Sequence, residues 1–364
     1  MGFRGIDWSQ VHQKRSNRPF YLIMGLFSRL YSIAGALRLR GYETGFLKKM
    51  RLPGFVLSIG NITAGGTGKT PAVIMIAGWA LRQGLRPAVL SRGYGGAYGS
   101  KVFQVSDGEK ISATANEAGD EPMLLARALP GVPVVLSKRR YPAGMYASKK
   151  FGSDFFVLDD GFQHMALERD IDMVLLDAES PFGNGYLLPR GPLREPLKNL
   201  GRADAICLTR ASETESGMAD THLLPDVVSG KPLFYAGHVP EKVVFPNRQE
   251  EEPADFLKGK RVVAFAGIGN PLSFKKTLER QGARIIKFER FADHHPFGRR
   301  EIDLLALEVK KTGADCLITT EKDWVRLSGT GASYPSISYL RVRFEILSDK
   351  DGFFEFIKNE IKRK

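Results

Sequence analysis

The sequence is poor in cysteine, has no excess of acidic residues and contains few long apolar runs. Its two cysteines, Cys207 and Cys316, lie far apart without a CxxC spacing or a nearby histidine cluster. This excludes a disulfide-stapled scaffold, gives no indication of zinc and favours a reducing, cytosolic compartment. No cleavable signal peptide is recognisable, because the first residues are polar and no small-residue cleavage site follows the apolar stretch cleanly.

The overall composition is that of a globular protein. With 364 residues the chain can form one large or two medium domains, each with a sizeable core. Hydrophobic residues make up 43% and charged residues 26%, which are ordinary globular values. The net charge of +13 favours an anionic partner, such as nucleic acid, phospholipid headgroups or a phosphorylated ligand.

Most of this charge lies near the N-terminus, where residues 1–51 carry ten basic and two acidic side chains. Residues 20–37 form an apolar stretch broken only by Arg29, long enough to be borderline for crossing a membrane. Arg18, Arg29 and Arg40 recur every eleven residues, which also fits a helix lying at the headgroups. We expect this segment to contact an anionic membrane, either by spanning it or by lying on its surface. A helix packed on the core is the alternative, and no nucleic-acid-binding motif is present.

After Pro53, short apolar runs alternate with helical patterns, which predicts parallel sheets covered by helices. We expect a membrane-associated segment at 1–52, a core at 53–236, a linker at 237–259 and a smaller α/β lobe at 260–364. The expected strands are 55–59, 87–91, 132–136, 155–158, 173–176, 205–208, 262–266, 284–288, 316–319 and 338–344, with helices at 271–281 and 300–311.

The strongest motif is GNITAGGTGKT, residues 60–70, which follows an expected strand and precedes an expected helix. This is the context and composition of a phosphate-binding P-loop, in which glycines allow backbone N–H groups to surround phosphate oxygens. Lys69 would reach the β and γ phosphates of ATP, and the Thr70 hydroxyl would bind Mg²⁺. The generic pattern has glycine where Thr63 stands. The residues expected to bind the nucleotide are Thr63, Ala64, Gly65, Gly66, Thr67, Gly68, Lys69 and Thr70.

A P-loop also needs an acid at the end of a neighbouring strand to position Mg²⁺. Asp159 and Asp160 directly follow the expected strand 155–158, and Asp177 is a weaker rival at the end of another strand. Capping of a following helix or turn is the alternative role for either Asp. The fold expected from these patterns is α/β, with a P-loop NTPase-like parallel core, a second lobe and an N-terminal membrane-associated helix.

Three further polar segments are candidates for chemistry. Asp120 opens a predicted helix in GDEP, where a cap is the alternative role. The segment 293–297, DHHPF, places two histidines beside an acid, which suits metal binding, general-base catalysis or plain solvation. The turn-rich segment 183–196 carries Arg190 and Arg194, which suit an anionic acceptor unless the segment is an ordinary surface loop.

Together these segments resemble the tetraacyldisaccharide 4′-kinase family. The resemblance is carried, in chain order, by GNITAGGTGKTP, SRGYGG (91–96), GDEP (119–122), LDDGFQH (158–164), GNGYLLPRGPLREP (183–196), DHHPF (293–297) and TTEKDWVRL (319–327). Thr63 is the residue type this family carries at that position. The resemblance implies transfer of the γ-phosphate of ATP, with Mg²⁺, to the 4′-hydroxyl of a tetraacylated glucosamine disaccharide 1-phosphate, forming lipid IV-A in lipid A biosynthesis.

The resemblance also implies roles for individual residues. Asp120 and His294 would activate the acceptor hydroxyl, and their pairing would bring the two lobes together over ATP. Whether His294 or His295 is the catalytic histidine stays open, as does the identity of the direct metal ligand. Thr70, Glu121, Asp159 and Asp160 form the expected metal set, and Arg190 and Arg194 the expected acceptor site. A tetraacylated acceptor places the enzyme at the cytoplasmic face of the bacterial inner membrane, as a peripheral or monotopic protein.

Two other functions remain compatible with the residues alone. One is a P-loop kinase for a water-soluble acceptor, whose N-terminal helix packs on the core. The other is a membrane-associated nucleotide switch that hydrolyses ATP to change partners and needs no acceptor site. The segments 183–196 and 293–297 favour phosphoryl transfer over switching.

Overall fold

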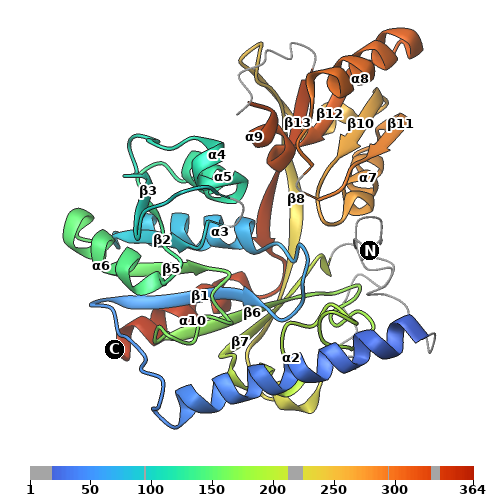
Figure 1. Cartoon of the computed structure of the whole chain (residues 1–364). Coiled ribbons are helices and arrows are strands. Elements are labelled where there is room, and N and C mark those ends of the chain that lie inside the picture. Colours follow the sequence, from blue (N-terminus) through green and yellow to red (C-terminus); the bar gives the residue numbers. More distant parts are fainter. Residues whose placement is uncertain (1–18, 94–95, 212–223, 294, 329–336) are drawn as a thin grey trace. The chain divides into compact units, whose positions relative to one another are not determined.

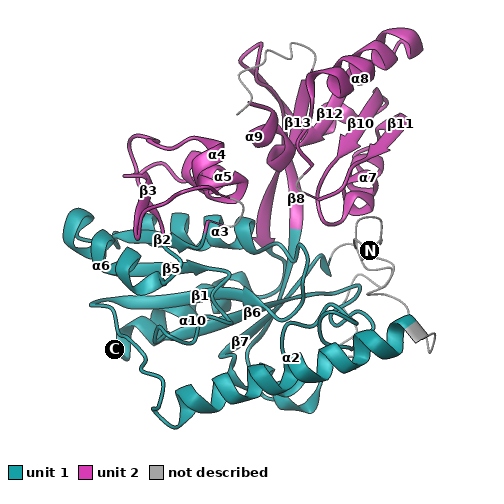
Figure 2. Cartoon of the chain, viewed as in Figure 1, with its two compact units in different colours: residues 1–92, 137–237, 346–364 teal, residues 93–136, 238–345 magenta. Residues whose placement is uncertain are grey.

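The protein is described by a computed structural model covering residues 19–93, 96–211, 224–293, 295–328 and 337–364 (Figure 1). The chain divides into two compact units, coloured in Figure 2. Unit 1 comprises residues 1–92, 137–237 and 346–364, and unit 2 comprises residues 93–136 and 238–345.

Unit 1 is built on a parallel sheet in the order β2-β5-β1-β6-β7, extended by the first residues of β8. The strands are β1 (Phe55–Asn61), β2 (Pro87–Ser91), β5 (Phe155–Asp159), β6 (Ile171–Asp177), β7 (Ala205–Thr209) and β8 (Leu233–Phe245). The helices are α2 (Pro19–Glu43), α3 (Lys69–Arg82), α6 (Arg140–Phe151) and α10 (Lys350–Lys362), with 3-10 turns η1 (Leu197–Arg202) and η4 (Asp226–Val228).

The central strands β1 and β5 are buried along their whole length. Apolar, unalternating strands of this kind form where helices cover a parallel sheet on both faces. Their register sets Ile59 opposite Asp159, so the P-loop and the acids after β5 leave the sheet at the same edge. Gly60 is required there, because a Cβ at this position would lie 2.5 Å from the Phe162 Cβ.

The C-terminal residues complete the core of unit 1 through α10. The Phe353 ring meets the Phe234 ring edge-on at 4.9 Å between centroids, and the Phe354 ring stacks on Trp79 of α3 at 5.1 Å. Aromatic side chains bury large apolar areas, so these contacts fix the last helix to the first lobe.

Unit 2 contains a second parallel sheet in the order β11-β10-β12-β13. Its strands are β10 (Arg261–Ala266), β11 (Arg284–Arg290), β12 (Cys316–Thr320) and β13 (Ile337–Ile346), with β9 (Glu250–Pro253) antiparallel to the end of β8 and β3 (Phe103–Ser106) antiparallel to β4 (Val134–Leu136). The helices are α4 (Ala115–Ala118), α5 (Asp120–Ala128), α7 (Pro271–Arg280), α8 (Arg299–Thr312), α9 (Glu321–Ser328) and the turn η5 (Ala254–Leu257).

Alternate residues of β10 serve two separate apolar clusters. Val262 and Ala264 belong to the cluster that includes Phe274 of α7, whereas Val263 and Phe265 pack with residues of α8. Because successive side chains of a strand point to opposite faces, α7 and α8 cover opposite faces of this sheet.

The predicted α/β fold with a mostly parallel sheet is confirmed, as is the presence of an N-terminal apolar helix. Each of the expected strands is present, with no end displaced by more than about two residues. The expected linker 237–259 differs, because it is largely strand. Pro240 lies between the part of β8 that pairs with β7 and the part that pairs with β9. Neither pairing needs a backbone N–H at this position, which proline lacks.

The grouping of residues 93–136 also differs from the expected ranges. These residues belong to unit 2, since β3 and β4 pair with each other and α5 packs against α9. Asp120 therefore lies in the same unit as the segment 293–297. The sequence predicts that pairing of Asp120 with that segment brings two lobes together. Because both lie in unit 2, such a pairing would instead form within one unit.

Candidate active site

The P-loop connects β1 to α3 at the carboxyl edge of the sheet in unit 1. Gly65 and Gly68 have φ angles of 123° and 82°, where a side chain would strain the backbone. Gly68 caps α3 without a side-chain hydrogen bond, which leaves the N–H groups of the first helical turn available to an anion. The Oγ1 of Thr67 is buried and has no hydrogen-bond partner among the described residues. The loop is thus a cradle of donors that fits phosphate.

Asp160 faces this loop between two cations. Lys69 Nζ lies 3.7 Å from Asp160 Oδ1, and the two Nη atoms of Arg194 donate to the two carboxylate oxygens at 2.9 and 2.8 Å. Burial opposes ionisation of Asp160, but Lys69 and Arg194 outweigh it and lower its pKa to about 2. Lys69 therefore lies beside a negatively charged oxygen at the end of the P-loop.

Asp159 is used differently from its neighbour. Its side chain is buried and accepts a hydrogen bond from Ser91 Oγ at 2.8 Å, while its carbonyl accepts one from Arg140 Nη2 at 3.1 Å. The two consecutive acids thus separate into a buried carboxylate tied to β2 and a half-exposed one beside the P-loop.

The segment 183–196 contains no helix or strand and lies directly against the P-loop. Ala64 N donates to Pro192 O, and Arg194 N donates to Ile62 O, both at 2.7 Å. The Arg194 guanidinium also donates to the Thr63 carbonyl, at 3.2 Å. Arg194 therefore ties the P-loop backbone to Asp160.

Arg190, the other arginine of this segment, is turned toward α2. Its guanidinium carbon lies 3.7 Å from the centre of the Tyr186 ring, and its backbone N–H donates to Ser28 Oγ at 3.2 Å. A side chain in place of Gly25 would come within 3.1 Å of Arg190 Nη1. Arg190 thus secures the contact between the loop and α2.

A second basic cluster in unit 1 surrounds His164. The backbone N–H of Arg140 donates to His164 Nε2 at 3.4 Å. Burial lowers the pKa of His164 to about 4, and nearby arginines contribute; these are Arg140, Arg169, Arg38 and Arg92. His164 is therefore neutral near pH 7, and the cluster presents a positive field to an anion.

In unit 2, the acids of GDEP lie in the first turn of α5, after Gly119 with a φ of 88°. The Arg326 guanidinium donates from Nε to Asp120, and Lys322 Nζ lies 3.0 Å from Glu121 Oε1. The same ammonium lies 3.8 Å from Asp293 Oδ1. Two sequence segments predicted to hold catalytic residues, Asp120 in one and a histidine in the other, are therefore contacted by one helix, α9.

The two adjacent histidines can now be distinguished in part. His295 Nε2 lies 3.0 and 3.1 Å from the two carboxylate oxygens of Glu301, and its ring packs against Phe291 and Phe297. The Gly298 N–H and His295 together lower the pKa of Glu301. His295 is thus held by its own unit, while His294 lies outside the described residues.

Comparison with known proteins identifies the family of the chain. Residues 20–362 match the family model described as tetraacyldisaccharide-1-P 4′-kinase. The chain belongs to this family. The predicted enzyme class, an ATP-dependent kinase of lipid A biosynthesis, is thereby confirmed.

Individual relatives cover nearly the whole chain. The tetraacyldisaccharide 4′-kinase of Syntrophus aciditrophicus is 41% identical over 333 residues, covering 88% of both chains. That of Geobacter metallireducens is 42% identical over 311 residues, covering 85% of this chain and 90% of its own. The crystal structure of LpxK from Aquifex aeolicus in complex with ATP matches with a TM-score of 0.73 and 35% identity, covering 92% of this chain and 97% of that one.

For a kinase of this family, the residues of unit 1 fit a nucleotide-bound magnesium ion. No group of three or more His, Cys, Asp or Glu side chains in the described ranges could hold a metal by itself. Mg²⁺ bound with a nucleotide needs only one or two carboxylates, because phosphates and waters complete its shell. Asp159, Asp160 and Thr70 supply such oxygen donors near the P-loop, whereas Glu121 belongs to unit 2.

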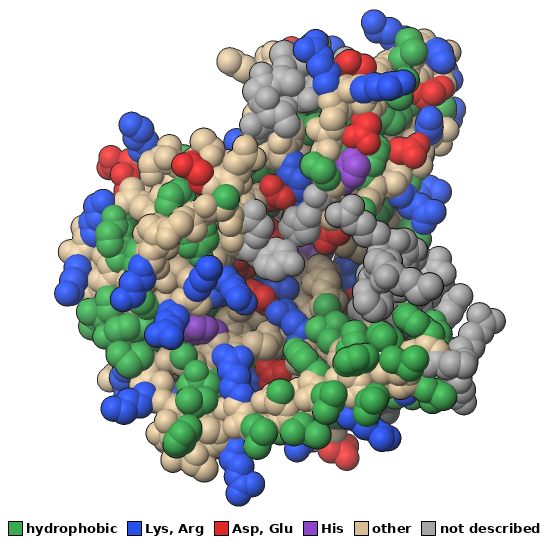
Figure 3. Space-filling model, in the orientation of Figure 1, with side chains coloured by type: hydrophobic (Ala, Val, Ile, Leu, Met, Phe, Trp, Pro, Cys, Tyr) green, Lys and Arg blue, Asp and Glu red, His purple; other side chains and the backbone are tan. Residues whose placement is uncertain are grey.

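The N-terminal helix α2 shows an apolar surface to the outside. It is the one helix of the described residues that is long and apolar enough to cross a membrane, and only 11% of its apolar window is buried. Figure 3 shows hydrophobic side chains gathered along it. The large exposed ones are Leu22, Ile23, Leu26, Phe27, Leu30, Tyr31, Ile33 and Leu37. The helix thus packs on unit 1 only through a narrow face that includes Met24 and Ser28, and most of its apolar surface is exposed.

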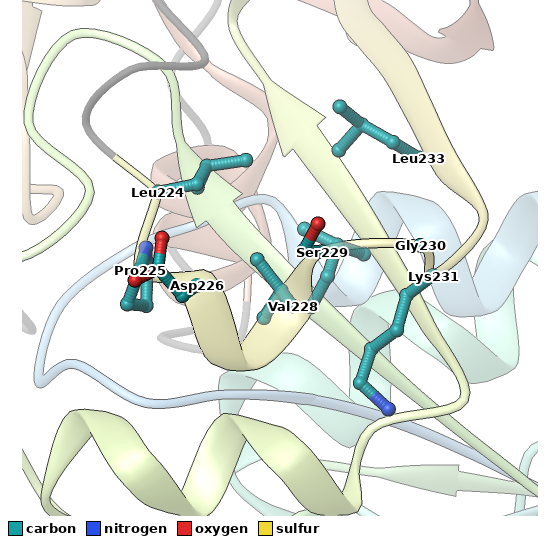
Figure 4. A pocket seen from close by; sticks show the side chains of 9 residues that line it. Leu224, Pro225, Asp226, Val228, Ser229, Gly230, Lys231 and Leu233 are labelled. Atoms are coloured by element: carbon teal, nitrogen blue, oxygen red, sulfur yellow. The ribbon is translucent and has the colours of Figure 1, made fainter.

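A cavity of about 370 Å³ lies elsewhere in unit 1, beside η4 (Figure 4). Its one lysine, Lys231, donates to the carbonyls of Gly201 and Ala203, so its charge is already engaged. The cavity shares no residue with the P-loop.

Sequence reasoning missed several residues of these sites. Lys322 and Arg326 stand four residues apart in TTEKDWVRL, a helical spacing that could have indicated one face directed at acids. Arg140 ends the basic run 138–140, but nothing in the sequence places that run beside His164.

Proposed function

We propose that this protein transfers the γ-phosphoryl group of ATP to the 4′-hydroxyl of a tetraacylated disaccharide 1-phosphate, forming lipid IV-A. The observation that carries the proposal is the P-loop beside Asp160 at the carboxyl ends of β1 and β5, in a chain of this family. The neighbour from Aquifex aeolicus binds ATP, which supports ATP as the nucleotide here.

The P-loop and Lys69 would hold the triphosphate. Lys69 would exchange its 3.7 Å contact with Asp160 for a phosphate oxygen, at little cost because the pair is long and partly exposed. Thr70 with Asp159 or Asp160 would hold Mg²⁺, which neutralises developing charge on the phosphates. Arg194 would keep Asp160 aligned with the P-loop through its bidentate contact.

Asp120 and His294 would activate the acceptor hydroxyl. His295 is less suited to this role, because its Nε2 is occupied by Glu301 and two aromatic rings enclose it. We therefore assign the hydroxyl-activating role to His294 and a structural role to His295. Replacement of His295 by Gln should lower kcat much less than replacement of His294, and equal losses in kcat would contradict this assignment.

The basic cluster around His164 is suited to the acceptor's own phosphate. Arg38 lies on α2, whose outer face is apolar, and both Arg38 and Arg92 are exposed, so a lipid seated on that helix would place its phosphate beside these two arginines, with the buried Arg140 behind them. Arg190 and Arg194, the arginines expected to bind the acceptor, are engaged with Tyr186 and Asp160. They remain candidates for supporting the acceptor site.

We further propose that α2 lies in the cytoplasmic leaflet of the inner membrane and does not span it. Ser28, in the middle of the helix, donates to Leu187 O at 2.7 Å and accepts from Arg190 N–H, which anchors that point to unit 1. After the helix, Phe46 is 87% exposed and is followed by the exposed Lys48 and Lys49, a combination that binds anionic lipid.

The transfer reaction can be tested directly with γ-labelled ATP, Mg²⁺ and the disaccharide 1-phosphate lipid. Label should enter the lipid with the intact protein and be nearly absent with Lys69→Ala. ATP hydrolysis without lipid labelling would favour the nucleotide switch, and labelling of a water-soluble sugar in place of the lipid would favour the soluble-acceptor kinase.

Membrane attachment can be tested with vesicles containing anionic phospholipid. The triple variant Phe46→Ser, Lys48→Glu, Lys49→Glu should bind about 30-fold more weakly or worse, because each lysine near the surface contributes about 1 kcal/mol. The matched control Leu304→Ser, Lys310→Glu, Lys311→Glu replaces one exposed apolar residue and reverses two exposed lysines of α8 in unit 2. Equal binding by both variants would contradict this mode of attachment.

A further inference from the structure

Helix α9 directs two basic side chains at the acids of GDEP. Lys322 and Arg326 are four residues apart, so they lie on one face of the helix. That face meets the first turn of α5, where Asp120 and Glu121 begin the helix. Each acid of the pair thus has its own cation from the same neighbouring helix.

The contact between Arg326 and Asp120 is the more buried of the two. The Arg326 side chain is 7% exposed, and besides Asp120 it contacts Asp323 Oδ1 and the Gly267 carbonyl, both from Nη1 at 2.8 Å. Asp323 is fully buried and accepts further bonds from Gly267 N at 3.0 Å and Thr320 Oγ1 at 2.7 Å. The guanidinium therefore has little freedom to move, and it fixes the carboxylate that it binds.

Lys322 joins two separate segments. Its ammonium lies 3.0 Å from Glu121 and 3.8 Å from Asp293, the first residue of DHHPF. It is therefore placed to set the distance between the GDEP turn and the DHHPF segment, within one unit of the protein.

We propose that α9 is the positioning element of the hydroxyl-activating site, with Arg326 orienting Asp120 and Lys322 orienting Glu121 and Asp293. Neither side chain touches the reacting atoms in this role. The inference rests on the proposed function, since it takes Asp120 as the residue that activates the acceptor. This proposal gives a role to the segment 319–327, which takes no part in the P-loop chemistry.

A double-mutant cycle tests Arg326. Arg326→Met should lower kcat for lipid phosphorylation by about ten- to a hundredfold and leave KM for ATP within about twofold, because the P-loop belongs to unit 1. Arg326→Lys should recover part of the loss, since one charged donor returns. In an Asp120→Ala background, Arg326→Met should cause little further loss. The matched control Arg343→Met removes an exposed arginine of β13 and should leave kcat unchanged.

The outcomes separate the two proposals. If Asp120→Ala retains full kcat, the proposed activating residue and the role of Arg326 both fail. If Asp120→Ala is impaired but Arg326→Met lowers kcat by the same factor with and without Asp120, the function stands and the positioning role of Arg326 is overturned.

If Arg326→Met does not fold, as judged by circular dichroism and thermal unfolding, Lys322→Met carries the test, because Lys322 is more exposed, at 21%. It should lower kcat by about tenfold with KM for ATP unchanged, and the loss should shrink in a Glu121→Gln background. An undiminished loss in that background, or a kcat equal to that of the unsubstituted protein, would overturn the proposal.

Discussion

Each unit holds a cluster of ion pairs, with Asp160 between two cations in unit 1 and Arg326 between two acids in unit 2. The two clusters differ in how firmly the cations are fixed. In unit 1, Lys69 lies 3.7 Å from Asp160, whose side chain is 38% exposed. In unit 2, Arg326 is 7% exposed and is bound to the fully buried Asp323. The long, partly exposed pair can separate at little cost, whereas separating the buried pair leaves an unpaired charge. One site is therefore built to exchange its partner, and the other to keep it.

The largest effect expected from this difference is on phosphoryl transfer by Lys69→Met. Loss of the ammonium removes a donor to the phosphates and should lower kcat by roughly 10²- to 10³-fold. The thermal midpoint should hardly change, because Arg194 still holds Asp160. Steady-state kinetics and thermal unfolding measure the two effects, with the exposed Lys149→Met as control. A large fall in the midpoint would mean that the Lys69 pair is structural, which would remove the contrast between the units.

A second expected effect is on stability. Asp323→Asn should destabilise unit 2 by about 3 kcal/mol, since the one amide oxygen cannot accept from Arg326 and also from the Gly267 N–H and the Thr320 hydroxyl, as the two carboxylate oxygens do. Asp160→Asn should cost unit 1 less than this, because water at the half-exposed Asp160 side chain screens its contacts with Lys69 and Arg194. Hydrogen exchange of β12 and of β5, in each variant, reports on the two units separately. Equal protection losses would contradict the comparison.

The two carboxyls should also respond to pH with opposite sign. The pKa of Asp160 is lowered to about 2 from an ordinary value of 3.8, so its stabilising contribution is present above pH 4 and is lost as the pH falls toward 2. Burial raises the pKa of Asp323, so ionisation of this group makes stability fall as the pH rises above 3.8. The free energy of unfolding can be measured from pH 2 to 6. Asp160→Asn should remove the rise of this free energy with pH that Asp160 causes, and Asp323→Asn should remove the fall that Asp323 causes. Slopes that change in the same direction would refute the assignment.

The smallest expected effect concerns the basic cluster of unit 1. The pKa of His164 is lowered to about 4 from 6.5, so between these pH values His164 is protonated in the unfolded chain but neutral in the folded protein. Stability should therefore fall as the pH decreases from 6.5 to 4, and His164→Gln should flatten that part of the profile. Inorganic phosphate should raise the His164 pKa, measured by NMR, if the cluster binds anions. A pKa insensitive to phosphate would remove the cluster from the acceptor site.

Much of the fold was predictable because its strands are apolar runs of ordinary length between turn residues. Phe55–Asn61 and Phe155–Asp159 have this character, and their burial on both faces explains why they read as unbroken hydrophobic segments. The strand β8 was missed, because Pro240 and Pro246 indicate a linker. Its pairing with β13 joins residues that are remote in sequence, which no local pattern reports.

The P-loop and the acids after β5 could be read from the sequence because their chemistry depends on local spacing: glycines before Lys69, and acids directly after a buried strand. The partners of those acids could not. Arg194 is 34 residues from Asp160, and Arg326 is 206 residues from Asp120. Ion pairs over such separations exist only once the strands and helices that carry them have packed. The sequence alone therefore determined which groups are available for phosphoryl transfer, and the tertiary structure decided which cation holds which acid.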